Sequence, residues 1–374
     1  MDSDPINMAS KNPLDLPEIR LQTAIYLTPS DAAKCVSVCK AWHHTFLPIV
    51  WASVEVKAGA SGQTLGGPSP DALERHRDLV IHLDIDQQVH RRYTMQFPKL
   101  RSLSLRSADG FNGGFEYGYN PAAIIASNPS LTDIAVFRMK GDLRLSFWNA
   151  IEKLDSGVFL AMFFESITDV PTANAFWRAC THLHGLDLDG VALTRNGDLR
   201  SLTFPNIRKL KLDTLLGLEL EDQLELIIRC PAIEELYWSS DDSEMGEYRK
   251  RLSELAASGA WPKLGSVDIS GNMDDGHIAD LIDSMEKAAE LTFSASGFGP
   301  QAYEVLQSHF RSLQVLCVVA CPDMTSPMLL QVLSSCPALT ELQADEILAG
   351  DIIGGNPWIC CSLRIFGVNV VFQE

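Results

Sequence analysis

Apolar residues recur along most of this chain in a fixed frame, at a first position and again three and five residues later. The frame matches twelve times from Val80 onward, and its starts lie 20 to 31 residues apart, about 26 on average. The stretches Cys230–Trp238 and Cys336–Ala344 nearly repeat each other within it. An internal repeat of this length indicates a solenoid in which each unit packs on its neighbours. The frames start at Val80, Leu100, Leu131, Gly157, Leu183, Ile207, Ile233, Leu264, Ala288, Leu313, Leu339 and Leu363.

The second and third apolar positions of each frame alternate as they do in a short β-strand with one buried face. Proline stands two residues before six of the starts, where it suits the turn that enters a strand. Between strands, residues 220–228 carry apolar side chains at helical spacing. The pattern predicts alternating strands and helices. They form either a solenoid or, as the alternative, a doubly wound α/β fold whose units vary more in length.

The frame resembles the L-x-x-L-x-L core of leucine-rich repeats, whose units run to about 20–29 residues. It departs from that family because no clear asparagine ladder follows the strands. The resemblance implies an α/β solenoid, a leucine-rich-repeat-like horseshoe, over residues 80–374.

An apolar block at residues 13–51 precedes the repeats and follows a polar segment, residues 1–12, that we expect to be disordered. Pro17 suits the first position of a helix, where its missing N–H is harmless. The Thr28-Pro29 pair should stop that helix, and Ser30 should cap a second one. A third helical piece follows. The block is therefore predicted to be a small all-α segment.

Several features of this block resemble an F-box: Leu16-Pro17-Glu18-Ile19, Tyr26-Leu27, Asp31, Val38-Cys39-Lys40-Ala41-Trp42 and Trp51. F-box proteins bind the Skp-type adaptor of cullin–RING ubiquitin ligases and capture substrates with the domain that follows, so the resemblance implies these partners. One departure is Thr23, at a position expected to be apolar. The alternative is a generic helical cap on the solenoid. By the resemblance, the adaptor-binding residues are Leu14, Leu16, Pro17, Ile19, Leu27, Val36, Val38 and Trp42.

Residues 52–79 join the two parts and read as an irregular strand, a loop rich in Gly, Ser and Pro, and a short helix. Two longer insertions directly follow frame strands, at residues 107–120 and 239–247. The first could present aromatic side chains to a partner, and the alternative is a solvated insertion that binds nothing. Its aromatic residues are Phe111, Phe115, Tyr117 and Tyr119.

Residues that alternate with the buried strand positions should line the concave surface of the solenoid. Aromatic side chains rimmed by charge gather there on neighbouring repeats, as they do in protein interfaces. We expect Phe159 and Phe163 to anchor an apolar group and Asp187 and Asp189 to select a basic one. The alternative is that a helix or loop covers the phenylalanines. The predicted substrate-binding residues are Phe137, Phe159, Phe163, Asp187, Asp189, Lys209, Lys211 and Tyr237.

Composition narrows the class of partner. The 374 residues are 46% hydrophobic and 21% charged, which is typical of a globular protein. A net charge of −18 disfavours nucleic acid and anionic membranes as partners, although solubility alone explains such a charge. No apolar run reaches the about 18 residues of a membrane helix, and we expect no signal peptide because no basic segment and apolar run stand at the N-terminus. Because the nine cysteines follow no disulfide framework, we expect reduced thiols and a cytoplasmic and/or nuclear protein.

Sequence motifs of enzymatic chemistry are absent. No G-x-S-x-G elbow, GxGxxG loop or HExxH helix occurs, which disfavours a hydrolase-like enzyme. Cys35 and Cys39 are better explained as residues of a helical core than as zinc ligands. His182 and His184 lie near two aspartates, but these residues are too scattered to predict a metal site. We therefore predict no catalysis, no cofactor and no metal. The predicted function is substrate recognition in an SCF-type cullin–RING ubiquitin ligase, and the alternative is a binding scaffold without a ligase.

Overall fold

The structure of the chain is a computed structural model. It describes residues 13–58, 64–86, 95–106, 121–139, 143–154, 157–194, 197–239, 245–271 and 273–371. The chain divides into two compact units, Met1–Ala135 and Val136–Glu374. The aromatic insertion predicted at 107–120 lies outside the described residues, as do residues 240–244 of the second insertion.

The first unit begins with three short helices around a small core. They are α1 (Pro17–Ala24), α2 (Pro29–Val36) and α3 (Lys40–Ala52), preceded by a 3-10 turn at Pro13–Asp15. The core consists of Ala24, Ala32 and Phe46, with further apolar side chains packed against it. The all-α segment is as predicted, but its second cap is not.

Thr28, and not Ser30, caps α2. The Thr28 side chain accepts the backbone N–H of Asp31 at 3.2 Å, and Pro29 occupies the first turn of the helix. Proline at the first helical position is pre-set in helical φ, so the residue before it becomes the cap. The sequence prediction at Ser30 was therefore wrong by two residues, because Pro29 begins a helix where it was expected to end one.

The first unit continues into a parallel sheet. Strand β1 (Ser53–Ala58) pairs with β3 (His82–Asp86), and β3 pairs with β4 (Ser102–Arg106), all parallel and in register. A short strand β2 (Thr64–Gly66) runs antiparallel to β1. The helices of this part are α4 (Pro70–His76), a 3-10 turn at Arg77–Leu79 and α5 (Pro121–Ser127), and β5 (Asp133–Phe137) spans the unit boundary. Strand β1 and helix α4 lie within residues 52–79, and β2 lies within the stretch rich in Gly, Ser and Pro.

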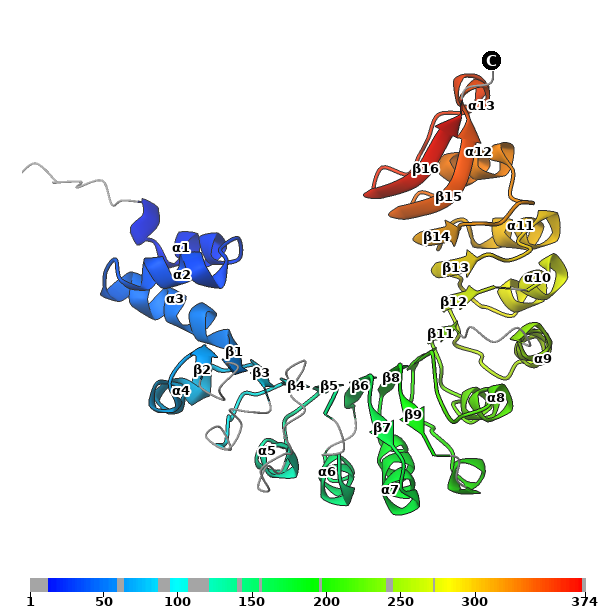
Figure 1. The fold of residues 1–374 in the computed structure, drawn as a ribbon. Helices are drawn as coiled ribbons and strands as arrows, with labels where there is room; N and C mark the ends of the chain where they lie inside the picture. The colour runs from blue at the N-terminus through cyan, green and yellow to red at the C-terminus, as the bar shows by residue number, and fades with distance from the viewer. Residues whose placement is uncertain are drawn as a thin grey trace, which may run out of the picture. The chain divides into compact units, whose positions relative to one another are not determined.

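The second unit repeats one strand–helix arrangement many times. Its parallel strands are hydrogen-bonded in the order β6-β8-β10-β11-β12-β13-β14-β15-β16, and β7 and β9 form a separate pair. Its helices lie on one side of these strands (Figure 1). In chain order the elements are α6 Leu145–Ile151, β6 Phe159–Phe163, β7 Ser166–Ile167, α7 Val170–Cys180, β8 Gly185–Asp189, β9 Ala192–Leu193, η4 Gly197–Ser201, β10 Lys209–Asp213, α8 Leu220–Ile228, β11 Glu235–Ser239, α9 Met245–Ala257, β12 Ser266–Ser270, α10 Asp275–Asp283, β13 Glu290–Ser294, α11 Pro300–Leu306, η5 Gln307–His309, β14 Val315–Val318, α12 Ser326–Ser335, β15 Glu341–Leu348, α13 Ala349–Gly354 and β16 Ile365–Val371.

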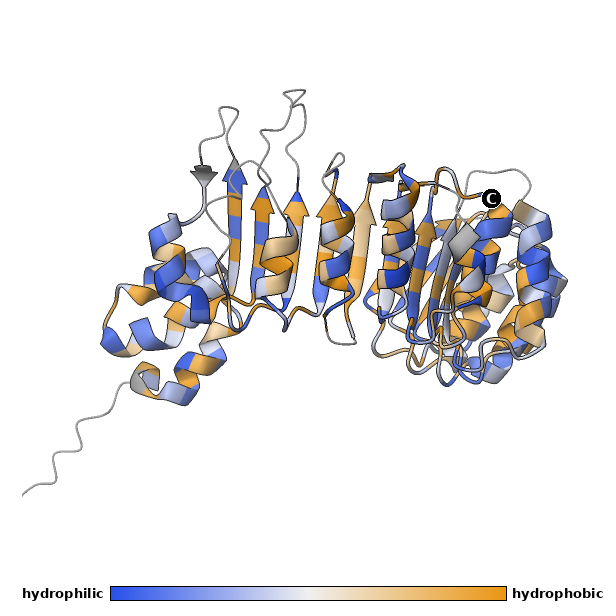
Figure 2. Cartoon of the chain, turned by 90° about the horizontal axis from the view of Figure 1, so that it is seen from below, coloured by the Kyte–Doolittle hydropathy of each residue, from blue (hydrophilic) through white to orange (hydrophobic). Residues whose placement is uncertain are grey.

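Burial follows the repeat frame. Leucines at the second and third frame positions are buried: Leu186, Leu188 and Leu212 are fully inaccessible, and Leu210 is 1% exposed. Their strand neighbours Asp187, Lys211 and Gln343 are only half-buried. Figure 2 shows this alternation of hydrophobic and hydrophilic residues along the strands. The register read from the sequence is confirmed, and the fold is α/β, a leucine-rich-repeat-like solenoid of parallel strands alternating with helices.

A left-handed residue closes most of these strands. Arg138, Phe164, Gly190, Gly271 and Ala295 each follow the last residue of a strand and have positive φ. Each donates its backbone N–H to a carbonyl at the end of the next strand, at 2.6–3.0 Å. Backbone groups thus link neighbouring repeats at this edge. The missing ladder noted in the sequence therefore does not prevent the repeat from closing.

The twelfth frame is the exception to the burial rule. The sequence register places Phe366 and Val368 of β16 in the core, yet Phe366 is 37% exposed and Val368 is half-buried. Strand β16 lies at the edge of the sheet and pairs with β15 alone. Within the described residues it has no following repeat to pack on, so its apolar side chains stay accessible. Burial of the last frame was wrongly predicted.

Candidate functional sites

The N-terminal helices leave many large apolar side chains exposed. Helix α1 buries Arg20 and Ala24, which lie four residues apart on one face. The bulkier apolar residues on its other faces remain in solvent. Seven large apolar side chains between residues 14 and 38 are exposed by 40% or more: Leu14, Leu16, Ile19, Leu21, Ile25, Tyr26 and Val38.

Arg20 fixes the loop that carries part of this surface. Its guanidinium donates from Nε to the Thr45 hydroxyl on α3 at 3.2 Å and from Nη1 to the Leu14 carbonyl at 3.4 Å. One buried side chain therefore ties the start of the segment to its third helix. Thr23, the departure from the F-box pattern, donates its hydroxyl to the Ile19 carbonyl at 2.8 Å, so its polar group is satisfied within α1.

The predicted adaptor-binding residues fall into two groups. Leu14, Leu16, Pro17, Ile19 and Val38 are exposed and available to a partner. In contrast, Leu27, Val36 and Trp42 pack against the three-helix core, and the Trp42 ring lies 5.3 Å from that of Phe46. These three residues help to hold the helices together, and each is half-buried.

The most exposed apolar side chains of α1 and its end are Leu21, Ile25 and Tyr26. Leu21 and Ile25 were not singled out from the sequence, and Tyr26 was named as part of the F-box resemblance but not as an adaptor-binding residue. The available signal was the pair Leu21 and Ile25, four residues apart and therefore on one helical face.

The side of the second unit's sheet away from its helices, here called the open face, is organised in rows. Because the strands pair in register, equivalent residues of successive strands stand side by side. The first row is Phe159, Gly185, Lys209, Glu235, Ser266 and Glu290. The second row is Ala161, Asp187, Lys211, Tyr237, Asp268 and Thr292. The third row is Phe163, Asp189, Asp213 and Ser239.

Aromatic rings occupy the β5–β6 end of the open face. The rings of Phe137 and Phe163 stack with centroids 4.5 Å apart and planes 5° apart. Phe159 lies against Gly185, where an added Cβ would collide with the ring. Glycine at 185 is therefore what allows the Phe159 ring to lie across the neighbouring strand. All three phenylalanines are half-buried, so each keeps part of its ring accessible.

Charged side chains follow directly on the next strands. Lys211 Nζ lies 3.5 Å from Asp187 Oδ1 and 5.2 Å from the centre of the Tyr237 ring. The Tyr237 hydroxyl donates to Asp213 Oδ2 at 3.1 Å, and Lys209 pairs with a glutamate of β11 at 2.6 Å. The predicted cation selector Asp187 is thus already partly neutralised within the protein. Among the described residues, no partner of the Asp189 side chain is found.

Burial shifts the pKa values of several groups in this charged cluster. It raises the pKa of Asp187, against the lowering effect of Lys211, and it raises the pKa of Asp268 to about 6, with the nearby Asp213 adding to the rise. Burial and Asp213 also raise the pKa of Tyr237 to about 12. Asp213 and Asp268 extend the acidic surface beyond the predicted residues. Their place in the same rows as Asp189 and Asp187 was the signal that could have included them.

Other site types find no support in the described residues. They contain no group of three or more His, Cys, Asp or Glu side chains placed to hold a metal. None of their helices combines the length and apolar character that crossing a bilayer requires. All nine cysteines are described, and each is a free thiol. Burial raises the pKa of Cys180, Cys230 and Cys336, which keeps these thiols protonated.

Comparison with known proteins adds little beyond the architecture. No family model matches the chain, and no curated protein matches it either. A crystal structure of the Rad7 and Elc1 complex from yeast is similar to it at 13% identity and a TM-score of 0.42, over 80% of this chain and 86% of that one. An internalin from Listeria monocytogenes is similar at 14% identity and a TM-score of 0.32, over 71% of each chain. Since similarities this low identify no family, the fold class rests on the strands and helices themselves.

Proposed function

We propose that this chain is a substrate-recognition subunit of a cullin–RING ubiquitin ligase. Its N-terminal helices bind a Skp-type adaptor, which connects the chain to the cullin, and the open face of its repeats binds the protein substrate. The chain itself carries out no catalysis and needs no cofactor, and it works in the cytoplasm and/or the nucleus, where its thiols stay reduced.

The observation that carries this proposal is the exposed apolar surface of residues 14–38. The three helices already complete a core around Ala24, Ala32 and Phe46, so the exposed side chains contribute little to folding. Exposed apolar side chains concentrated in one short segment are typical of an interaction site. Leu16, Pro17 and Ile19, which carry the F-box resemblance, lie within it. An end cap of a solenoid, in contrast, should present a polar outer surface.

The open face supports the substrate half of the proposal. Its second and third rows carry Asp187, Asp189, Asp213 and Asp268 against the single cation Lys211. The surplus of negative charge fits a basic partner, and the half-buried phenylalanines beside it fit an apolar anchor. The substrate segment is therefore expected to combine an aromatic or aliphatic side chain with Lys or Arg.

Co-purification of the full chain with a recombinant Skp-type adaptor and cullin tests the adaptor half. The double variant Leu16→Ala, Pro17→Ala should abolish capture of both partners and leave the repeats folded. A matched control removes exposed apolar groups elsewhere, with Ile353→Ala and Trp358→Ala in the second unit, which are 87% and 42% exposed in the unchanged chain. Unchanged capture by the N-terminal variant, or an equal loss in the control, would show that the surface is not an adaptor site.

A further inference from the structure

Strand β16 is an unprotected edge of the sheet. It pairs with β15 alone and is the last strand in the order of this unit (Figure 1). It spans seven residues, Ile365–Val371, and none of them is charged or is proline. Natural sheets usually protect an exposed edge with a short strand, a charged side chain or proline, because a free edge can pair with another chain. Strand β16 has none of these features.

The backbone of β16 offers three residues for such a pairing. The Ile365 N–H donates to the Thr340 carbonyl at 3.2 Å, toward β15. Neighbouring residues of a strand direct their N–H and C=O groups to opposite sides, so Phe366, Val368 and Val370 direct theirs away from β15. In the described part of the chain, no strand pairs with β16 on that side.

The apolar interior of the solenoid is open beside this edge. Phe366 pairs with Leu342 of β15, which is buried, yet Phe366 itself is 37% exposed. Val370 pairs with the buried Ile347 and is 41% exposed. The ring of Trp358, also partly exposed, lies 5.5 Å from that of Phe366. In a repeat array the next unit covers such positions, so this end presents an apolar surface that a further layer would bury.

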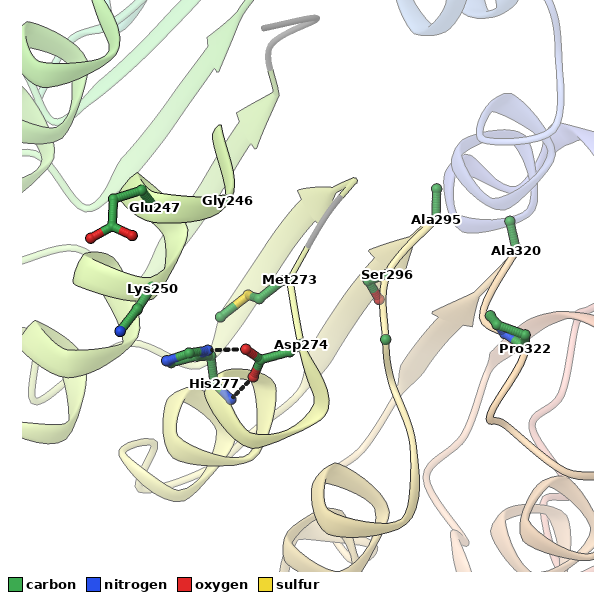
Figure 3. A pocket seen from close by; sticks show the side chains of 11 residues that line it. Gly246, Glu247, Lys250, Met273, Asp274, His277, Ala295, Ser296, Ala320 and Pro322 are labelled. Atoms are coloured by element: carbon green, nitrogen blue, oxygen red, sulfur yellow. Dashed lines mark hydrogen bonds and ion pairs between the residues drawn. The ribbon is translucent and has the colours of Figure 1, made fainter. Parts of the chain in front are cut away.

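Charge is nearly absent from this end of the chain. Residues 352–371 contain one charged side chain, Arg364, although 21% of the whole sequence is charged. The surface elsewhere in this unit is different: the pocket in Figure 3 is lined by Glu247, Lys250 and Asp274 among others. Two copies of a chain with a net charge of −18 repel each other, but two β16 strands can meet without placing carboxylates face to face.

The strand is complementary to a second copy of itself. When two β16 strands run antiparallel with Val368 opposite Val368, Phe366 of each copy lies opposite Val370 of the other. All three outward residues then exchange hydrogen bonds, and every facing pair is apolar. The exposed parts of Phe366, Val370, Trp358 and Ile365 amount to about 350 Å² per copy. With the strand backbones added, two copies approach the about 1,000 Å² that a specific interface needs.

We propose that β16 pairs with β16 of a second copy, antiparallel and about a two-fold axis at Val368, and thereby joins two chains into a symmetric dimer. The sheets of the two copies continue into each other, and their apolar ends cover one another. The contact uses neither the N-terminal helices nor the rows of the open face, and it does not depend on a ligase function.

Sedimentation equilibrium of the full chain from about 1 µM to about 100 µM tests the proposal. A reductant prevents disulfide-linked dimers through the exposed Cys361. The mean mass should rise with concentration from 41.2 kDa toward twice that value. We expect a dissociation constant on the order of 10 µM, because the interface is at the small end of its class. A mass of 41.2 kDa throughout would overturn the proposal, since another part of the chain or a different protein would then cover the edge.

Charge-swapped variants test the antiparallel register. Phe366→Glu with Val370→Glu, and Phe366→Lys with Val370→Lys, should each weaken the dimer at least about tenfold, because like charges then face each other. Mixed in equal amounts, the two variants should form a heterodimer, because opposite charges then meet. The control Ile353→Glu, at a position outside β16 that is 87% exposed, should leave the dimer unchanged. Undiminished dimers of the charged variants, or no association in a mixture of folded variants, would overturn the proposal.

Hydrogen exchange of the unchanged chain provides a measurement that needs no substitution. Peptides covering Ile365–Val371 should exchange about threefold more slowly at high than at low protein concentration, because pairing protects the outward N–H groups. Peptides covering Ser326–Ser335 of α12 should exchange equally at both concentrations. Equal exchange of β16 at both concentrations would overturn the proposal whether or not the charged variants fold.

Discussion

The N-terminal helices and the repeats of the second unit use apolar residues in opposite ways. Leucines at the frame positions of the repeats are nearly inaccessible, as Leu188 and Leu210 illustrate. Leucines in and next to α1 are instead exposed, Leu16 by 43% and Leu21 by 58%. Both regions look hydrophobic in the sequence. The difference teaches that the spacing of apolar residues, and not their number, decides whether they are buried in the fold or remain exposed.

The physical reason is the number of neighbouring helices and strands against which an apolar side chain can pack. Each strand residue that points inward in the repeats meets a helix of its own unit and the equivalent residue of the next strand. Three helices of 8, 8 and 13 residues can enclose only a small core. Once Ala24, Ala32 and Phe46 fill it, further apolar side chains have no place inside.

The largest expected contrast comes from the same substitution in both regions. Leu188→Ala should lower the free energy of unfolding of the repeats by about 2–5 kcal/mol, because it opens a cavity in packed surroundings. Leu16→Ala should change the free energy of unfolding by no more than about 0.5 kcal/mol. Urea denaturation followed by circular dichroism measures both. Similar losses in the two variants would refute the division between folding and recognition residues.

A second contrast lies within the N-terminal helices. Trp42→Ala should destabilise them by about 2 kcal/mol, since its half-buried ring packs on Phe46. Val38→Ala should leave them intact and weaken only adaptor capture, because Val38 is 62% exposed. Hydrogen exchange over residues 17–52 reports the first effect, and co-purification reports the second. Faster exchange in the Val38 variant would place Val38 in the core.

Charge substitutions on the open face test whether a basic peptide responds to nearby carboxylates or to the net charge of the chain. Replacing Asp189 and Asp268 by asparagine should weaken capture of a synthetic peptide carrying one phenylalanine and two arginines about tenfold, as loss of about 1.4 kcal/mol would do. The matched control replaces Glu341 and Glu346, on β15, by glutamine. Fluorescence anisotropy measures both affinities. Equal weakening would mean that the peptide responds only to net charge.

The titration of Asp268 gives a smaller, pH-dependent test. Its folded-state pKa of about 6 lies above the ordinary value near 3.8, so the folded protein holds this proton more tightly than the unfolded chain. The associated stability is fully present below about pH 4 and is lost as the pH rises through about 6. Asp268→Asn should therefore unfold at a higher urea concentration than the unchanged chain at pH 7 and show no such gain at pH 4. A gain of the same size at both pH values would contradict the raised pKa.

The smallest expected effect comes from substitution by glycine. It should stabilise the repeats at a strained position and destabilise the N-terminal helices. Thr214 has a φ of +48°, which is unfavourable for a β-branched residue. Thr214→Gly should therefore stabilise the repeats by about 1 kcal/mol. Ala33→Gly, at an exposed position inside α2, should destabilise the N-terminal helices by about 1 kcal/mol. Thermal unfolding measures both. A loss of stability in the Thr214 variant would show that its side chain matters more than its backbone.

Features that depend on the periodic spacing of apolar residues could be predicted from the sequence. Features that depend on which strands lie side by side could not. The strand register and the helix at 220–228 follow from alternation and helical spacing alone, and both are confirmed. The ion pair between Lys211 and Asp187 depends on which strands lie side by side and in what register, so no local pattern could reveal it. Arg249 is a further case. An arginine in a polar helix is expected at the surface from the sequence, and only its place on the inner face of α9 shows that Arg249 is buried.

The left-handed residue at the end of most strands has a consequence for how such a chain can change over generations. Its link to the next repeat runs through a backbone amide and a backbone carbonyl, which every sequence except one with proline at the donor position supplies. The hydrogen bond itself therefore requires no particular side chain at this edge, although the positive φ favours glycine. A lineage of these proteins can lose every recognisable signature there while its members still fold alike. Common ancestry would then be visible in the spacing of buried leucines long after it had faded from the residues between them.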